Sequence, residues 1–332
     1  MHPKLRQGGK IMGIQIGAER APYFAKVGKD VVGCNSVAEV AKLAELDWEV
    51  EKRPIYLQTT KQIAVDDEYE DYTPVADKFA TVRKDTNQVL GIVGNQYEVV
   101  QNIEGFEFID DVLGKDITFV KAGTHAKGTR VFIAAKAQSV EIEGDEIIPY
   151  ILFTNSHDGA GTVTAIFTPM RQVCSNGLML PAKGHQEIKI RIQHTKNVKD
   201  RLMIAKEVIK KNNKYLEALK AQAAELRNTE FSKEEFTQLA TELAKVKEGE
   251  EMTKGQLQMI EDLQTAYQAE DLQKFEGTAW QAINAVADYD SHRIPARETG
   301  NNEDQFNRIL YGMAVLQAAY QIIARMKGIR LY

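Results

Sequence analysis

The sequence predicts an α+β fold: an antiparallel sheet with a packed helix, followed by a largely α-helical C-terminal part. Two changes of period carry this prediction. From Thr81 to His194 apolar and polar residues alternate with a period of two, which is typical of half-buried strands. From Asn197 onward apolar residues recur at steps of three and four, which is typical of helices. One strand, one helix and then a run of strands favour an antiparallel sheet over a doubly wound one.

Three regions follow from these periods: an N-terminal extension with one helix (residues 1–75), an α+β sheet core (residues 76–195) and a helical C-terminal region (residues 196–332). In the extension, Ser36-Val-Ala-Glu39 has the form of a capping box and predicts a helix start. The acidic run Asp66–Asp71 is interpreted as a solvated loop rather than a metal site, because no apolar pattern around it would hold ligands in place.

Six strands and one helix are expected in the sheet core. The strands are Val89 to Val93, Ile117 to Val120, Thr129 to Ala137, Ile147 to Phe153, Thr162 to Thr168 and Glu187 to His194. The helix runs from Asn102 to Leu113. In the last strand three isoleucines point one way while Lys189 and Arg191 point the other, so we expect cationic side chains on the solvent side of the sheet.

The C-terminal region carries two clear helix starts. Ser232 with Glu235, and Thr253 with Gln256, each form a capping box next to a hydrophobic staple. A heptad-like seam precedes them, in which Asn212 either fixes the register of a coiled coil or marks a bend in a single helix. Two further helices are expected, from Ala279 to Tyr289 and from Glu303 to Lys327.

Composition is that of an ordinary soluble protein, with 43% hydrophobic and 27% charged residues in 332 positions. No apolar run is long enough to span a bilayer, and the first residues lack a signal-peptide core. Cys34 and Cys174 make neither a disulfide framework nor a zinc site by themselves. We therefore expect a cytoplasmic protein without membrane association, metal or cofactor.

Positive charge is concentrated in one stretch, although the net charge is -5. Lys183 to Lys214 contains ten lysines and arginines against three carboxylates. Such a stretch attracts phosphate backbones, whereas the alternative is a solvated helix face. The residues predicted to hold nucleic acid are Arg130, Arg171, Lys183, Lys189, Arg191, Lys196 and Lys199. Candidates for base stacking are Tyr97, Phe106 and Tyr150, with a core position as the alternative for each.

The stretch from Thr154 to Gly177 is rich in polar and turn-forming residues. Its members of unknown role are Asn155, His157, Asp158, Gly159, Cys174 and Asn176. A cysteine–histidine nucleophile or a divalent-ion site would need these side chains in contact, and no local spacing signature supports either. The alternative is a buried structural cysteine with a turn histidine. The Gly-Ala-Gly of the turn also lacks the lysine and following helix of a phosphate-binding loop, so no catalytic residue is assigned.

Four ordered motifs carry a resemblance to a known family. They are Tyr97-Glu-Val-Val-Gln-Asn102, Asn155-Ser-His-Asp-Gly159, Arg171-Gln-Val-Cys-Ser-Asn176 and Asn284-Ala-Val-Ala-Asp-Tyr289. Together they resemble the phage/plasmid-like family, which is catalogued as a domain of unknown function, over about Val89 to His292. The chain departs from the commoner pattern at Ser175, where many members carry Asn. The resemblance implies a mobile-element context in bacteria.

Two main hypotheses about function remain. The first is a phage or plasmid protein that binds or anneals single-stranded DNA as a homo-oligomer, without nucleotide hydrolysis. The order of elements also resembles that of single-strand-annealing recombinases, whose sheet and helix line a basic groove around a ring. The second is a metal-dependent hydrolase of nucleic-acid metabolism or phage defence, which requires His157, Asp158 and either Cys174 or Asn176 to converge in one cleft. A host-interaction protein that binds its partner through the helical part is the third alternative.

Overall fold

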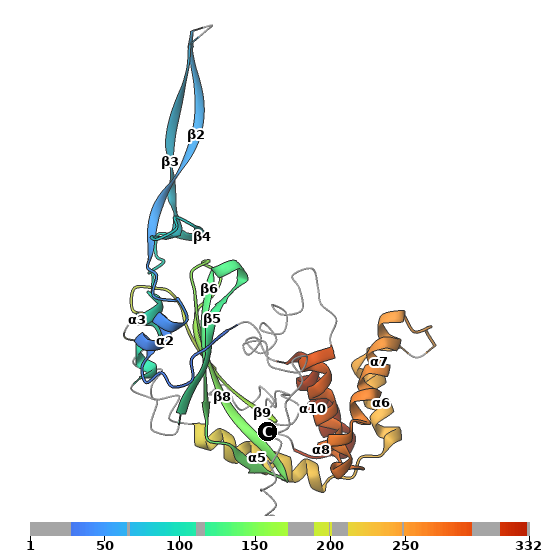
Figure 1. Cartoon of the computed structure of the whole chain (residues 1–332). Helices are drawn as coiled ribbons and strands as arrows, with labels where there is room; N and C mark the ends of the chain where they lie inside the picture. Colours follow the sequence, from blue (N-terminus) through green and yellow to red (C-terminus); the bar gives the residue numbers. More distant parts are fainter. Residues whose placement is uncertain are drawn as a thin grey trace, which may run out of the picture.

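The computed structural model describes residues 28–64, 67–110, 117–171, 189–198, 200, 212–247, 249–293 and 313–330. Figure 1 shows three parts: a main sheet, a long two-stranded ribbon that rises from one end of it, and a set of helices beside it. Strands fill most of the first half of the chain and helices most of the second. The predicted α+β fold is confirmed.

The main sheet, sheet A, is antiparallel throughout its described strands. Its order is β1-β5-β6-β8-β9-β10, with β7 paired to β8. The strands are β1 (Lys29–Asp30), β5 (Ile117–His125), β6 (Arg130–Ala137), β7 (Val140–Ile142), β8 (Asp145–Ser156), β9 (Val163–Arg171) and β10 (Lys189–Ile192). Five of the six expected strands, those from Ile117 onward, correspond to β5, β6, β8, β9 and β10, with ends that differ by a few residues.

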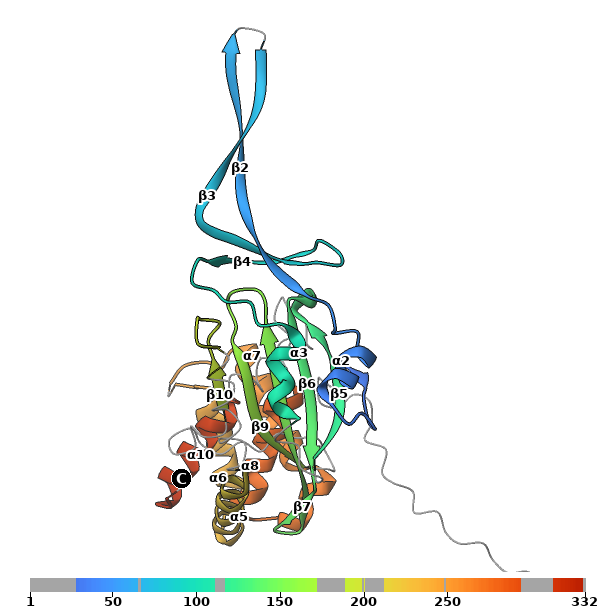
Figure 2. The same cartoon turned by 90° about the vertical axis from the view of Figure 1, so that its left-hand side faces the viewer.

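Two short helices cover one face of sheet A, with α3 in front of its middle strands in Figure 2. Helix α2 (Val37–Leu43) begins where predicted, because the Ser36 Oγ accepts a hydrogen bond from the Glu39 N–H. Helix α3 (Asn102–Phe106) continues into one 3-10 turn (Glu107–Ile109), and residues 111–116 lie outside the described part. Phe106 and Ile109 are buried, so the predicted helix is confirmed up to Ile109.

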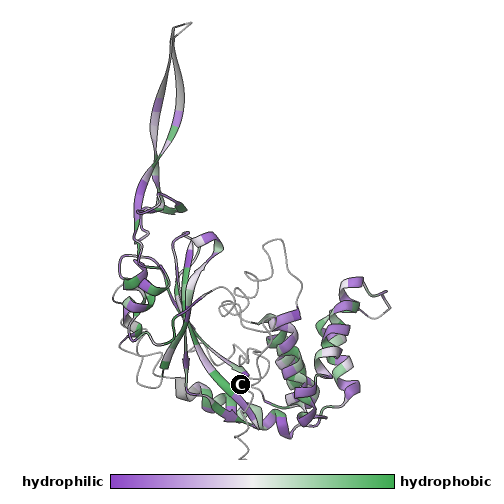
Figure 3. Cartoon of the chain, viewed as in Figure 1, coloured by the Kyte–Doolittle hydropathy of each residue, from purple (hydrophilic) through white to green (hydrophobic). Residues whose placement is uncertain are grey.

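The ribbon was not predicted. It consists of β2 (Val50–Ala64) and β3 (Asp67–Arg83), and β4 (Val89–Gly94), the remaining expected strand, pairs with β3 only near its base. The interpretation of Asp66–Asp71 as a loop is wrong, because Asp67 to Asp71 are paired with β2 inside β3. The predicted region boundary at residue 75 also lies within this strand. In Figure 3 hydrophobic segments interrupt a ribbon that is otherwise white or purple.

The helical part is built around α8, whose ten residues are all buried. The helices are α5 (Asn212–Asn228), α6 (Lys233–Leu243), α7 (Lys254–Tyr267), α8 (Ala279–Asp288) and α10 (Ala314–Lys327), with a 3-10 turn at Glu270–Phe275 and a π turn at Tyr289–Arg293. Both predicted capping boxes are confirmed, at Ser232 and at Thr253. Asn212 is the first residue of α5, and the part of the heptad-like seam that precedes Asn212 lies outside the described residues. None of the described helices is long and apolar enough to cross a membrane.

Candidate functional site

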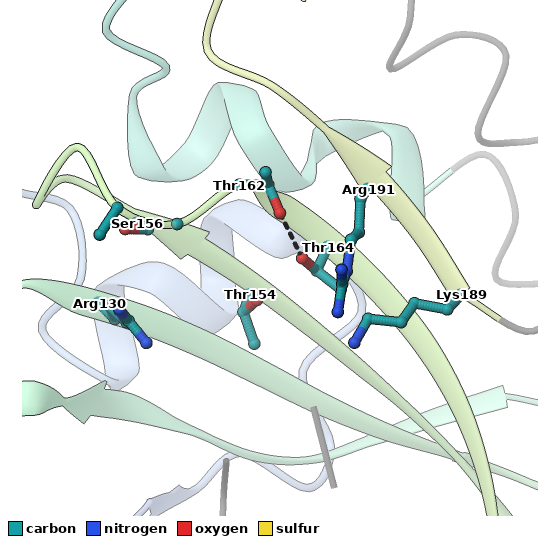
Figure 4. A pocket seen from close by; sticks show the side chains of 9 residues that line it. Arg130, Thr154, Ser156, Thr162, Thr164, Lys189 and Arg191 are labelled. Atoms are coloured by element: carbon teal, nitrogen blue, oxygen red, sulfur yellow. Dashed lines mark hydrogen bonds between the residues drawn. The ribbon is translucent and has the colours of Figure 1, made fainter. Parts of the chain in front are cut away.

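A polar pocket lies at one end of sheet A, where four neighbouring strands contribute side chains (Figure 4). Its lining residues are Arg130 of β6, Thr154 and Ser156 of β8, Ala160, Gly161 and Thr162 of the turn, Thr164 of β9, and Lys189 and Arg191 of β10. Three of these are cations and four carry hydroxyl groups. The pocket therefore gathers hydrogen-bond donors and positive charge, which suits an anion.

Strand register explains why these residues meet. Thr154 pairs with Thr164, and Thr164 pairs with Arg191, so the three form one row across the sheet. Successive residues of a strand point to opposite faces. Asn155, which follows Thr154, points to the other face, where its Nδ2 donates to the Val100 carbonyl oxygen at 2.9 Å. The pocket therefore lies on the face of sheet A turned away from α3.

The Asp158 carboxylate organises one wall of the pocket. It accepts hydrogen bonds from the Arg130 Nε at 2.8 Å, from the Ser156 Oγ at 2.5 Å and from the Ala160 and Gly161 N–H groups at 2.8 and 3.1 Å. Burial by itself raises the pKa of Asp158, but these hydrogen bonds and the Arg130 charge bring it below its ordinary value. Asp158 is thus a carboxylate at neutral pH that holds the Arg130 guanidinium at the edge of the pocket.

The turn between β8 and β9 needs glycine at two positions. Gly159 has a φ of +76°, in the left-handed region that favours glycine. A Cβ atom on Gly161 would lie 2.4 Å from the Ser156 Cβ, which is closer than carbon atoms can approach. The turn therefore folds back tightly on the end of β8, and this brings the Gly161 N–H to Asp158.

The opposite wall is formed by β10, the outermost described strand on that side of sheet A. Arg191 is exposed, whereas Lys189 is half-buried. Burial, and to a smaller extent the charge of Arg191, lowers the pKa of Lys189 to about 8. Lys189 is therefore mostly protonated at pH 7 and loses its charge within a moderately alkaline range.

A family model now adds to this geometry. The model described as a domain of unknown function (DUF932) matches residues 89–310, about two thirds of the chain. The chain belongs to this family. The predicted resemblance to a family of unknown function is thereby confirmed. No curated protein and no solved structure matches the chain. The DUF932 region contains every pocket-lining residue, whereas β2 and β3 precede it.

Two motifs of the DUF932 region meet behind the pocket. The His157 Nε2 lies 2.7 Å from the Asn102 Oδ1, and the Asn102 Nδ2 donates to the Leu46 carbonyl oxygen at 2.8 Å. The Tyr97 hydroxyl donates to the Ser156 carbonyl oxygen at 2.9 Å. These bonds join the segment before α3 to the β8–β9 turn, so the motifs have a structural part in holding the pocket wall.

The histidine is not placed for catalysis. His157 is fully buried against the Trp48 ring, and burial lowers its pKa to about 3, so its imidazole is neutral at pH 7. The Asp158 carboxylate forms an ion pair with Arg130 instead. Within the described residues no group of three or more His, Cys, Asp or Glu could hold a metal ion. Cys174 and Asn176, the other members of the predicted set, lie outside those residues.

The prediction that Arg171 holds nucleic acid is wrong. Its side chain is 1% exposed, and it donates to both Asp145 oxygens at 2.8 and 2.9 Å and to the Asp271 Oδ2 at 2.9 Å. Asp145 also pairs with Lys274 at 2.9 Å. Arg171 therefore links sheet A to the helical part. Its partners come from 26 and 100 residues away, so no local pattern could reveal them.

Other predicted residues have different placements. Lys196 is exposed in the turn after β10 and does not line the pocket, and Lys183 and Lys199 lie outside the described residues. Among the stacking candidates, Phe106 is a core residue, and Tyr97 stacks on His194 with ring centroids 4.8 Å apart. Sequence reasoning missed the hydroxyl-bearing lining residues. Their signal was the alternation of threonine at positions 162 and 164, on the side of the strand opposite Val163 and Ala165.

Proposed function

We propose that this DUF932 protein binds single-stranded DNA of a phage or plasmid in the cytoplasm of a bacterial host. In this proposal it acts as a homo-oligomer that anneals strands and hydrolyses no nucleotide. One observation supports it above all: Arg130, Lys189 and Arg191, which were predicted to hold phosphate, line a single pocket although they come from two strands far apart in the sequence.

Phosphate recognition fits the chemistry of that pocket. Cations supply most of the affinity for a nucleic-acid backbone, and hydroxyl donors add hydrogen bonds to phosphate oxygens. Thr154, Thr162 and Thr164 lie between the two cationic walls. The exposed Arg191 on an outer strand leaves room for a chain that continues past the pocket, as a groove for an extended single strand requires. The proposal also includes Lys183, Lys196 and Lys199 among the residues that contact phosphate.

The hydrolase alternative has less support. It requires His157 and Asp158 to converge with a third group in a cleft, but the His157 ring points into the interior while Asp158 bonds Arg130. A host-interaction role for the helical part is favoured by no contact or surface described above. The anion pocket is therefore the feature on which we base the function.

The test is an anisotropy titration of labelled single- and double-stranded oligonucleotides over a series of salt concentrations. Lys189→Glu with Arg191→Glu should weaken binding and reduce the salt slope by about 1.4, because each phosphate contact on a single strand contributes about 0.7. The matched control is Lys233→Glu with Lys254→Glu, two exposed lysines in the first turns of α6 and α7, where a carboxylate is well tolerated. If the pocket variant and the control bind alike at low salt, the proposal fails.

A further inference from the structure

The root of the ribbon lies directly against the turn that forms one wall of the pocket. We define the ribbon root as the paired residues Lys78–Val82 of β3 and Val89–Gly94 of β4. The pocket turn is the segment His157–Thr162 between β8 and β9. Figures 1 and 2 show β4 beside the end of sheet A at which β6 begins, the end that carries the pocket. Two segments far apart in the sequence are therefore neighbours here.

The first contact between them is a buried hydrogen bond. Thr81 is 0% exposed, and its Oγ1 lies 2.6 Å from the His157 carbonyl oxygen and 3.3 Å from the Gly91 carbonyl oxygen. A hydroxyl has one proton to donate, so the shorter contact, to His157, takes it. The His157 N–H donates to the Thr129 carbonyl oxygen at 2.9 Å. The main chain directly before Asp158 is therefore held on one side by sheet A and on the other by the ribbon root.

The second contact is a close approach of two backbones. A Cβ atom on Gly91 would lie 2.6 Å from the Asp158 Cα and 2.6 Å from its carbonyl oxygen. Gly91 is not among the residues with a positive φ, so close packing, not backbone conformation, requires glycine at this position. On the other side of the contact, a Cβ on Gly159 would lie 2.9 Å from the Val93 Cγ1. The backbone of β4 thus rests on Asp158 with no room for a side chain.

We infer that Thr81 and Gly91 are positioning residues of the anion pocket, which act through Asp158 on Arg130. The Asp158 carboxylate accepts the Arg130 Nε–H at 2.8 Å, and both side chains are only 18% exposed. A displacement of the Asp158 main chain therefore moves the guanidinium that lines the pocket. The inference rests on the anion pocket of the proposed function. It adds a residue, Thr81, that precedes the region matched by the family model.

The first experiment is the anisotropy titration of a labelled single-stranded oligonucleotide with variants of the full chain. Gly91→Ala should weaken binding about tenfold, because a hydrogen bond to a charged group is worth at least that factor. The matched control on the same strand is Gly94→Ala, whose Cβ would meet no atom within 4 Å and which should bind as wild type does. Equal affinities of these two variants would overturn the inference.

A second pair of variants tests the hydroxyl and serves if Gly91→Ala fails to fold. Thr81→Val keeps the shape of the side chain but leaves the buried His157 carbonyl oxygen without its donor, so we expect about threefold weaker binding. Thr81→Ser retains the hydroxyl and should restore most of the affinity. If Thr81→Val binds as tightly as wild type, the hydrogen bond has no part in positioning the pocket, and the inference is wrong for Thr81.

A double-mutant cycle separates positioning from general destabilisation. If Gly91 acts through Arg130, Gly91→Ala should have little further effect on affinity in a chain that already carries Arg130→Gln, because the two substitutions remove the same contact. A destabilised fold would instead weaken binding by the same factor in both backgrounds. A full tenfold loss in the Arg130→Gln background would therefore overturn the inference.

Hydrogen exchange reports on the pocket turn without any ligand. The Ala160 and Gly161 N–H groups donate to the Asp158 Oδ1, so Gly91→Ala should speed their exchange in the free chain, while amides of the buried α8 keep their rates. If wild type binds no oligonucleotide but Gly91→Ala speeds exchange in the turn, only the DNA proposal is contradicted. If wild type binds and Gly91→Ala changes neither exchange nor affinity, only the positioning inference is contradicted.

Discussion

Sheet A and the ribbon use strands in opposite ways. In and next to sheet A polar and charged groups are buried and bonded to one another, as in the pairs Arg171–Asp145 and His157–Asn102. In the ribbon the side chains of Tyr56, Leu57, Tyr72 and Val75 are more than one third exposed. Buried polar groups and exposed apolar patches are the two informative departures from the usual distribution of residues. The polar groups of sheet A are therefore held in place by partners within the chain, whereas the ribbon exposes apolar side chains to solvent.

The largest expected effect comes from the buried ion pair. Asp145→Ala leaves the Arg171 guanidinium without its main partner, and breaking such a pair costs about 3–5 kcal/mol of unfolding free energy. Leu57→Ser in the ribbon should change it by less than about 0.5 kcal/mol in the monomer. Urea unfolding measures both. Similar losses for the two variants would contradict the contrast between sheet A and the ribbon.

A second contrast compares two glycines. Gly161→Ala places a Cβ against Ser156 in the pocket turn, so we expect a loss of about 1–3 kcal/mol and weaker oligonucleotide binding. Gly94→Ala, at the end of β4, meets no atom within 4 Å and should be nearly neutral. The check is urea unfolding combined with the anisotropy titration. A neutral Gly161→Ala would show that the turn adapts and that the tight return of the chain is not needed.

Local patterns predicted much of the fold, since alternation and capping depend on neighbours in the sequence. Ser232 and Thr253 cap their helices as predicted, and the alternation that placed Lys189 and Arg191 on one side of a strand is borne out by the pocket they share. Such signals involve residues within about ten positions of one another. Sequence reasoning therefore finds features whose residues are neighbours in the chain and misses those whose residues are far apart.

The missed features depend on partners elsewhere or on the lack of a core. Arg171 is neutralised by carboxylates that only the fold brings to it. The ribbon escaped detection because Tyr56 and Leu57 are adjacent and point to opposite faces, so the segment has no single apolar side. A strand exposed on both faces lacks the one-sided alternation by which strands are recognised.

Acid should destabilise sheet A and leave the ribbon unaffected, because the ribbon contains no histidine. Burial lowers the pKa of His157 to about 3 and of His194 to about 4, against 6.5 ordinarily. Below pH 6.5 the unfolded chain takes up protons that the folded chain does not. Stability that is complete above pH 6.5 is therefore lost as the pH falls toward 4, by at most about 1.4 kcal/mol per pH unit for each residue.

The measurement is urea unfolding between pH 7.5 and pH 5. His157→Gln should flatten the dependence of unfolding free energy on pH, even though it lowers stability at pH 7.5 through the lost Asn102 contact. A wild type with constant stability over this range would show that the histidines titrate alike in the folded and unfolded chains. The surroundings of His157 and His194 would then be accessible to water.

The smallest expected effect separates the pocket from general charge attraction. With a pKa of about 8, Lys189 loses its proton between pH 7 and pH 9, so oligonucleotide affinity should fall by up to about tenfold at constant ionic strength. A bound phosphate favours the charged lysine and makes the fall shallower. Lys189→Arg keeps the charge throughout and should bind almost equally at both pH values. If wild type and Lys189→Arg show the same pH profile, Lys189 does not contact the bound anion, and Arg130 and Arg191 would be the pocket cations that hold it.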